Sequence, residues 1–316
     1  EGIAAFPPFF FFFMSATPII LFSQPAQSLS EFRCRNRQRV RWSEVDLQKV
    51  VFNAHYLNYV DIGMSEYWRQ LAVPYEEGTQ RLGGELFLKA TQIEYHASAR
   101  LDDVVDIGIR VTRLGTTSVQ FEAGIFCADR LLVSATMVYV FADGAQRPVP
   151  LPDAYRQMVQ RYEAGEEMVE VKTGSWNVLG QDAMRLRMQV FVREQGIPVE
   201  IEADEFDVTS LHAVAINGLG MCVATGRMLP SANEADRADV MRIGRMAVAR
   251  PLRGTQLGRQ LLDALVDAAR RHGKRQVELH AQRTAENFYR RAGFTVQGEP
   301  YEEAGIPHIS MTKDLG

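Results

Sequence analysis

A chain of 316 residues is long for a single domain, so the length alone predicts two. The apolar and charged fractions, 46% and 23%, are typical of a soluble globular protein, and a formal net charge of −4 gives no reason to expect a nucleic-acid partner. Three widely spaced cysteines and six histidines show neither a Cys-x-x-Cys pair nor the spacing of a metal site, so we expect free thiols, a reducing cytoplasm and no bound metal.

The first 30 residues contain a homopolymer run from Phe9 to Phe13 and carry no charge between residues 2 and 30. A membrane span needs about 20 apolar residues, but four prolines interrupt this segment and Ser, Thr and Gln dilute it. The basic start of a signal peptide is missing as well. We therefore expect residues 1–30 to be a disordered extension and not a membrane anchor, with Met14 as the natural start and residues 1–13 as non-native.

Residues 37–141 have a mostly strand-like pattern, interrupted by one helix at 57–71 where apolar side chains recur at helical spacing. Strands bounded by turn residues are predicted at 38–45, 85–97, 104–114, 118–127 and 131–141. One long helix followed by a meander of antiparallel strands predicts an α+β fold, in which the sheet wraps a single buried helix. The proline-rich segment 147–152 cannot continue a central strand, and the charged stretch 156–172 predicts a short helix and then a linker.

The pattern becomes a mixture of helices and strands after Trp176. We predict helices at 181–194, 260–272 and 284–291 and strands at 211–217, 221–228, 243–248 and 276–280. Gly273 and Gly293 are suited to end the two later helices. The expected organisation is therefore a first domain at 31–155, a linker at 156–172 and a second, mixed α/β domain at 173–316.

A turn rich in small residues lies between the predicted strand at 243–248 and the helix that follows it. Its sequence is Arg253-Gly254-Thr255-Gln256-Leu257-Gly258-Arg259. Backbone N–H groups at a helix start bind phosphate oxygens, helped by the helix dipole. Small residues let the backbone approach the anion, and flanking arginines add charge-assisted hydrogen bonds. The turn therefore predicts a phosphate cradle.

Three further segments accompany this turn: 285–294, which reads AENFYRRAGF, 190–198, which reads VFVREQGIP, and 305–311, which reads GIPHISM. Together with the turn they resemble the GNAT family of N-acetyltransferases over about residues 168–316. The resemblance implies that the turn holds the pyrophosphate of coenzyme A, with Gln256 standing where glycine is usual. It also implies that Met246, Ala247, Val248 and Asn287 contact coenzyme A.

The GNAT resemblance implies acetyl transfer from acetyl-CoA to an amine, with Tyr289 as the acid that protonates the leaving thiolate. The alternative is that Tyr289 only packs its ring against the sheet. His280 and His308 are expected to be structural hydrogen-bond donors and not bases. The acidic residues between 194 and 207 form either a solvated loop or a group that attracts a cationic substrate. They are Glu194, Glu200, Glu202, Asp204, Glu205 and Asp207.

The segment 40–57, which reads VRWSEVDLQKVVFNAHYL, resembles the hotdog acyl-CoA thioesterases of the 4-hydroxybenzoyl-CoA type. Segments 93–103, 115–118 and 147–152 agree with the same family, so the resemblance covers about residues 33–155. Trp42 replaces a tyrosine of the family pattern and Lys49 replaces its glycine, while Asp61 stands where the helix usually carries glutamate.

The hotdog resemblance implies hydrolysis of an acyl-CoA thioester by Asp46, acting as base or nucleophile. The oxyanion donor it implies is the backbone N–H of Asn53, near the start of the central helix. His55 and Asp61 are secondary catalytic candidates. The alternatives are a loop or N-cap role for Asp46, a capping or interface role for His55 and a surface position for Asp61.

These resemblances lead to the hypothesis of a bifunctional enzyme with acyl-CoA and acetyl-CoA as substrates and no bound prosthetic group. Its partners would be an unidentified amine and a second copy of the chain, because an isolated hotdog unit exposes a sheet edge. We expect neither a nucleic acid nor a membrane as partner. Two alternatives stay open: one unit is a non-catalytic CoA-binding or oligomerisation module, or the thioesterase acts on acyl carrier protein.

Overall fold

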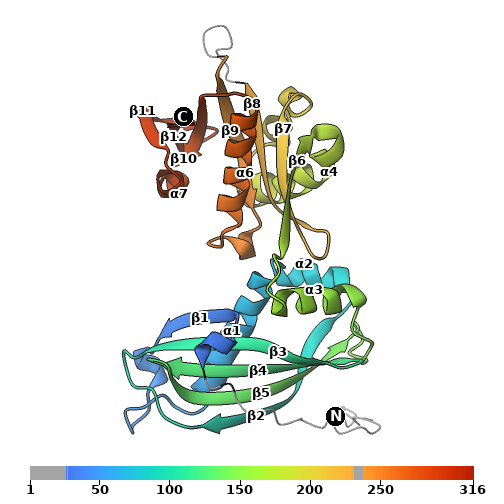
Figure 1. The fold of residues 1–316 in the computed structure, drawn as a ribbon, viewed down its shortest axis with the longest axis vertical. Helices are drawn as coiled ribbons and strands as arrows, with labels where there is room; N and C mark the ends of the chain where they lie inside the picture. The colour runs from blue at the N-terminus through green and yellow to red at the C-terminus, as the bar shows by residue number, and fades with distance from the viewer. Residues whose placement is uncertain (1–25, 27, 231–237) are drawn as a thin grey trace, which may run out of the picture.

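The computed structural model describes residues 26, 28–230 and 238–316. Most of the predicted N-terminal extension, including Met14, lies outside these residues. The described chain forms two sheets, one of five and one of seven strands, which Figure 1 shows in the lower and upper halves of the molecule. No helix within the described residues is both long enough and apolar enough to cross a membrane.

The first sheet is antiparallel, has the strand order β1-β3-β4-β5-β2 and curves around helix α1 (Figure 1). Its elements are β1 (Cys34–Arg39), α1 (His55–Gln70), β2 (Glu85–Tyr95), β3 (Val104–Leu114), β4 (Ser118–Cys127) and β5 (Arg130–Ala142). One face of α1, from Tyr56 to Trp68, is buried against β1 and β3. Gly63 permits this close packing, because a Cβ there would lie 2.8 Å from Ile109. The predicted α+β fold with one enclosed helix is confirmed.

The strand predicted over 38–45 is wrong in both bounds, because β1 covers Cys34–Arg39 and shares only residues 38 and 39 with it. Strand β1 stops at Arg39, and the chain turns into a short 3₁₀ segment, η2 (Trp42–Glu44). The buried Glu44 carboxylate causes this turn: it accepts hydrogen bonds from the backbone N–H of Arg41 at 2.7 Å and from the hydroxyl of Tyr59 at 2.6 Å. The second bond ties the turn to α1 and places the loop that follows it at the start of that helix.

Two helices outside the predicted meander complete the first unit, α2 (Tyr75–Leu82) and α3 (Asp153–Glu163). Helix α3 buries Tyr155, Met158, Val159 and Tyr162 in the same core as α1. The segment 156–172, expected to hold a short helix and a linker, contains most of α3 and the first residues of β6 (Val169–Ser175). Residues 164–168 connect these two elements, and the domain boundaries at 155 and 173 stay a prediction.

The second sheet has the order β11-β12-β10-β9-β8-β7-β6. Its further strands are β7 (Leu211–Asn217), β8 (Cys222–Pro230), β9 (Val240–Val248), β10 (Gln276–Gln282), β11 (Thr295–Glu303) and β12 (Ile306–Asp314). Its helices are α4 (Trp176–Arg187), the π-helical segment η3 (Met188–Glu194), α5 (Val199–Glu202), α6 (Leu257–Arg271) and α7 (Glu286–Arg291). The helix predicted at 181–194 therefore begins five residues earlier, and it becomes π-helical at Met188.

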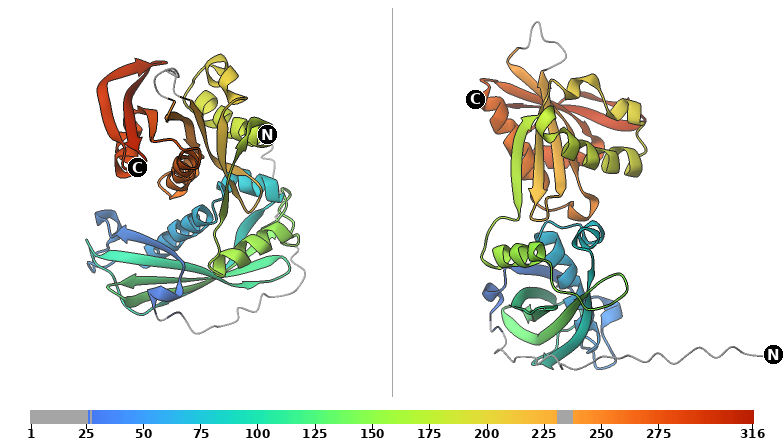
Figure 2. Two further views of the ribbon diagram at one scale, coloured as in Figure 1. Left: turned by 45° about the horizontal axis from the view of Figure 1, so that its top comes forward. Right: turned by 90° about the vertical axis from the view of Figure 1, so that its right-hand side faces the viewer.

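Strands β9 and β10 are parallel and pair only at their beginnings, from Val240 with Gln276 to Ile243 with Leu279. Beyond this point β9 continues to pair with β8, with an irregularity at Arg245, whose φ is 52°. Strand β10 instead follows β12. The two strands therefore separate, and Figure 2 shows the C-terminal strands turned away from the rest of the sheet. This separation positions the cavity described below.

The two units are packed directly against each other. The Asn217 side-chain amide donates to the carbonyl oxygen of Ala72 at 2.8 Å, and the Arg69 guanidinium donates to that of Pro251 at 3.2 Å. Leu219, in the turn between β7 and β8, is buried in the core of the first unit. Helix α1 therefore touches the segment that leads into the predicted phosphate cradle.

Candidate functional sites

The predicted phosphate cradle leads from the short segment η5 (Arg250–Leu252) into α6. Gly254 has a φ of 83°, which L residues with a Cβ rarely adopt, so the turn needs glycine at this position. The Thr255 hydroxyl donates to the Leu252 carbonyl oxygen at 2.7 Å and fixes the turn. The first-turn N–H groups of α6, including those of Gly258 and Arg259, lack acceptors within the helix. The turn thus presents donors and the positive end of the helix dipole to an anion.

Both arginines of the cradle already have carboxylate partners. The Arg253 guanidinium binds the two Glu194 carboxylate oxygens at 2.6 and 2.8 Å, and this hydrogen-bonded cation lowers the pKa of Glu194. Arg259 pairs with Asp263 at 2.8 Å.

Gln256 is exposed and has a φ of −78°, so the backbone does not require glycine there. The departure from the family pattern therefore leaves the turn geometry unstrained.

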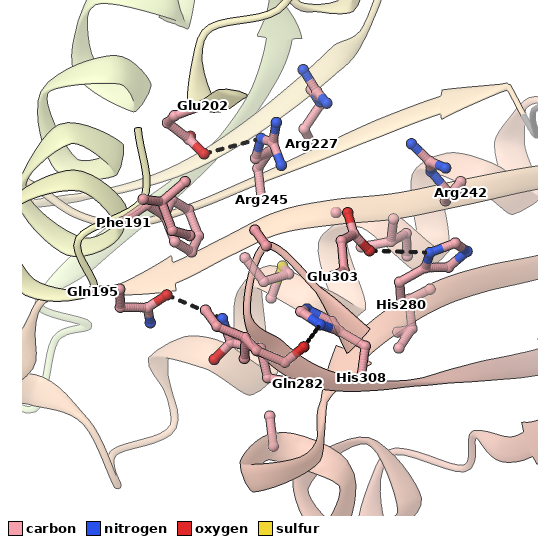
Figure 3. Close-up of a pocket in the computed structure, with 18 of the residues that line it drawn as sticks. Phe191, Gln195, Glu202, Arg227, Arg242, Arg245, His280, Gln282, Glu303 and His308 are labelled. Carbon is pink, nitrogen blue, oxygen red and sulfur yellow. Dashed lines mark hydrogen bonds and ion pairs between the residues drawn. The ribbon is translucent and has the colours of Figure 1, made fainter. Parts of the chain in front are cut away.

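A cavity of about 200 Å³ lies where β9 and β10 separate, and its wall is completed by β8, η3, α7 and the β11–β12 turn (Figure 3). Met246 of β9 and Tyr289 of α7 both line it. Tyr289 is only 8% exposed, and burial raises the pKa of its hydroxyl to about 12, so the phenol stays protonated at neutral pH. Ala247 is buried in the adjoining core, whereas Asn287 is exposed on α7.

The acidic residues between 194 and 207 are not one solvated loop. Asp207 is buried and accepts hydrogen bonds from Arg187 at 2.6 Å and from Arg227 at 2.7 Å. Asp204 binds Arg227 and Arg245, and the buried Glu202 binds Arg187 and Arg245. Both interpretations of the sequence are therefore wrong for these three acids, because arginines of α4, β8 and β9 neutralise them. Glu194, Glu200 and Glu205 are exposed.

Two histidines line the same cavity. His280 Nδ1 lies 3.8 Å from a Glu303 carboxylate oxygen, and burial, together with the nearby charge of Arg242, lowers the pKa of His280. His308 Nδ1 lies 2.8 Å from the carbonyl oxygen of Ile306 and thus takes the structural hydrogen bond that we expected. Sequence reasoning did not single out Arg242. Its place on the predicted strand, shortly before the residues that the GNAT resemblance assigns to coenzyme A, was the available signal.

In the first unit Asp46 lies in the loop between η2 and α1. One of its carboxylate oxygens accepts a hydrogen bond from the Gln48 N–H at 2.8 Å, which forms an Asx turn. Lys49 has a φ of 63°, so it adopts the conformation that the glycine of the family pattern would adopt without strain. Its N–H donates to the Asp46 carbonyl oxygen at 3.0 Å. Across the described residues, the Lys49 side chain forms no ion pair with Asp46.

Asn53 lies two residues before the first residue of α1. Its backbone N–H donates to no acceptor among the described residues, and its carbonyl oxygen accepts a hydrogen bond from the Tyr95 hydroxyl at 3.2 Å. His55 is the first residue of α1 and its Nδ1 lies 3.2 Å from the Asn58 side-chain nitrogen. Asp61 is exposed and lines a different cavity, of about 340 Å³, with Trp68, Tyr139 and Pro251. The loop that carries Asp46 does not contribute to the lining of this cavity.

Large apolar side chains are exposed in this part of the molecule. They are Trp42, Leu47, Phe52, Leu57 and Tyr95, of which Trp42 is 83% exposed. Strand β2, at the edge of the sheet, also exposes Phe87 and Leu88. Exposed apolar side chains that gather in one region are typical of a site of association or ligand binding.

Comparison with known proteins finds a family-model match for each unit. The model of the thioesterase-like superfamily matches residues 40–159, and that of the acetyltransferase (GNAT) domain matches residues 221–315. Protein ElaA of Escherichia coli (strain K12) is 35% identical over 134 residues, which are 42% of this chain and 85% of ElaA. The uncharacterized N-acetyltransferase YjcF of Bacillus subtilis is 34% identical over 135 residues, covering 42% of this chain and 91% of YjcF.

Among solved structures, a putative N-acetyltransferase from Lactobacillus plantarum has 33% sequence identity with this chain and a TM-score of 0.43. The match covers 47% of this chain and 99% of the Lactobacillus chain. A thioesterase from Thermus thermophilus, solved with coenzyme A and zinc, is 27% identical, covers 44% and 98%, and has a TM-score of 0.38. The N-terminal unit thus matches the model of the thioesterase-like superfamily, and through its C-terminal unit the chain belongs to the GNAT acetyltransferases.

Proposed function

We propose that this chain is a bifunctional enzyme that hydrolyses an acyl-CoA thioester in its first unit and transfers an acetyl group from acetyl-CoA to an amine in its second. The observation that carries the proposal is the cavity between β9 and β10. It brings Met246 and Tyr289 together, in the domain whose phosphate cradle follows β9 directly. The same activated carrier, coenzyme A, would serve both units.

In the second unit the pyrophosphate of acetyl-CoA would bind the first-turn N–H groups of α6. The thioester would then lie along residues 244–248 of β9, where pairing with β10 has ended. The amine nitrogen attacks the thioester carbon, so that a C–N bond forms and the C–S bond breaks. Tyr289 donates its proton to the departing sulfur, a role that requires a protonated phenol at neutral pH.

In the first unit Asp46 would activate water, or attack the thioester carbon itself, and CoA would leave as the thiol. The Asn53 N–H would stabilise the oxyanion that develops on the carbonyl oxygen. Its position just before α1 adds the favourable end of the helix dipole. Both groups lie in the segment that Glu44 ties to α1.

A second copy of the chain would cover the exposed apolar surface around Asp46 and the edge strand β2. An 11-residue edge strand with exposed Phe87 and Leu88 invites pairing, because its outer N–H and C=O groups have no strand beside them in this sheet. We therefore propose a homodimer with two-fold symmetry. The three cysteines, all free thiols, are compatible with the reducing cytoplasm that we propose as its location.

The test is thiol release from a panel of acyl-CoAs by the full chain, measured with and without an amine acceptor. Asp46→Asn should abolish the amine-independent release and Tyr289→Phe the amine-dependent release. Each variant is the folding control of the other, since each retains one activity. If thiol release is the same in Asp46→Asn as in the wild type, the first unit is a non-catalytic module. If parallel assays show faster hydrolysis of acyl carrier protein thioesters, these thioesters and not acyl-CoA are its substrate.

A further inference from the structure

Arg242 differs from the two other arginines that line the acetyltransferase cavity. Arg227 and Arg245 are each bound to the carboxylates of the buried network. Within residues 26, 28–230 and 238–316, Arg242 has neither an ion pair nor a side-chain hydrogen bond, although it lines the cavity and is only partly exposed. Of these three guanidinium groups, Arg242 is therefore the one that no carboxylate of the described residues binds within ion-pair distance, and its register neighbour on β10 is Glu278.

The position of Arg242 along β9 separates it from the cradle. The cradle follows the C-terminal end of β9, whereas Arg242 precedes Met246 by four residues, or about 13 Å of extended strand. A CoA thioester that enters from the cradle and reaches Met246 therefore leaves the Arg242 end of the cavity unfilled. This end is where an acceptor would meet the thioester.

The other groups at this end suit a molecule that carries both charges. The register of β9 and β10 pairs Arg242 with Glu278 and ends with Ile243 and Leu279, and His280 is the next residue of β10. Figure 3 shows Arg242, His280 and Glu303 on the same side of the cavity, where His280 Nδ1 lies 3.8 Å from a Glu303 carboxylate oxygen. Burial and Arg242 favour the neutral imidazole, which accepts a proton. The buried Nε of Arg227, which also lines the cavity, has no hydrogen-bond partner among the described residues and offers a further donor.

Building on the proposed acetyl transfer, we propose that the acceptor is a small amine that also carries a carboxylate, as an amino acid does. The carboxylate binds the Arg242 guanidinium, and the ammonium group lies at His280, with Glu303 beside it. One proton of the ammonium passes to His280. The free amine then attacks the thioester carbon, and Tyr289 protonates the departing sulfur. The Tyr289 oxygen takes back the surplus proton of the nitrogen, so that the products are an amide, free CoA thiol and one proton on His280.

The experiment compares acceptors in matched pairs, an amino acid and the amine left when its carboxylate is removed, such as lysine with cadaverine and phenylalanine with phenethylamine. The full chain is assayed as wild type, Arg242→Met, Arg242→Lys and, as a matched control, Arg271→Met at an exposed arginine of α6. We expect kcat/KM for the carboxylate-bearing acceptors to fall by about 10- to 100-fold in Arg242→Met, since a hydrogen bond to a charged group contributes that much. Arg242→Lys should recover part of the loss, and the decarboxylated amines should be unaffected.

Equal use of both members of each pair, unchanged by Arg242→Met, would overturn the inference and leave the acetyltransferase proposal standing. Failure to acetylate any amine, in protein that still binds CoA, would overturn both. Binding of an N-acetylated amino acid, measured by calorimetry on the CoA-loaded protein, gives a readout without turnover. It should weaken about 10-fold or more in Arg242→Met and not in Arg271→Met, and equal affinity in all three proteins would reject the carboxylate subsite.

Discussion

Replacing Asp207 with asparagine tests whether the buried ion network supports the acetyltransferase unit. Asp207 is 3% exposed, and one of its carboxylate oxygens accepts hydrogen bonds from the guanidinium groups of Arg187 and Arg227. Arg187 is 1% exposed and Arg227 is 3% exposed, so water cannot replace the lost carboxylate. The variant keeps the size of the side chain and removes its charge, which leaves two buried cations short of a partner.

The expected loss follows from these contacts. Each charge-assisted hydrogen bond contributes about 1.5–3 kcal/mol, and breaking a buried ion pair from one side costs about 3–5 kcal/mol. Because Arg187 keeps Glu202 and Arg227 keeps Asp204, we expect the free energy of unfolding of this unit to fall by about 3–5 kcal/mol. For a unit of this size, this loss lowers Tm by roughly 10 °C.

The assay is urea and thermal denaturation followed by tryptophan fluorescence. Trp176 reports on this unit, since its ring centroid lies 5.9 Å from the Arg187 guanidinium carbon. The matched control is Asp267→Asn on α6, where the same chemical change affects an exposed pair with Arg270 and should cost less than about 1 kcal/mol. If Asp207→Asn were no more destabilising than this control, the network would not support the fold and the reasoning from its burial would be refuted.

The remaining predictions concern the two sites. Asp46→Asn should lower kcat for thioester hydrolysis by at least about 100-fold, and Tyr289→Phe should lower kcat for acetyl transfer by at least about 10-fold while the Kd for CoA, measured by calorimetry, is unchanged. Because the pKa of His280 is lowered, its neutral form persists below pH 6.5. The acidic limb of the pH profile of kcat/KM for acetyl transfer should therefore lie below that pH and move to higher pH in Arg242→Met. A limb that this substitution does not move would exclude His280 as the base. Lys49→Gly should raise the free energy of unfolding in urea by up to about 1 kcal/mol, because it relieves the left-handed backbone conformation, and a clear loss would contradict this.

Local patterns were sufficient to predict much of the fold and to propose both motif-based sites. The predicted strands at 104–114 and 118–127 match β3 and β4 in full, because turn residues bound both runs of strand-favouring side chains. The cradle was readable for a similar reason: its donors are consecutive backbone groups at one helix start. The strand at 38–45 was misread because Glu44 bonds to Tyr59, 15 residues away, and this contact bends the chain.

Residues that lie close along the chain were enough to recognise both family resemblances and to propose the cradle, Asp46 and Tyr289 as functional. The partners of the acidic segment and the role that we propose for Arg242 could be found only from contacts between residues that are far apart in the chain. Asp207 meets Arg227 across 20 residues, and Arg242 of β9 lines the cavity together with His280 of β10 and Glu303 of β11. Charge at one position is visible in a sequence, but its neutralisation depends on which distant side chains the fold brings within a few ångströms.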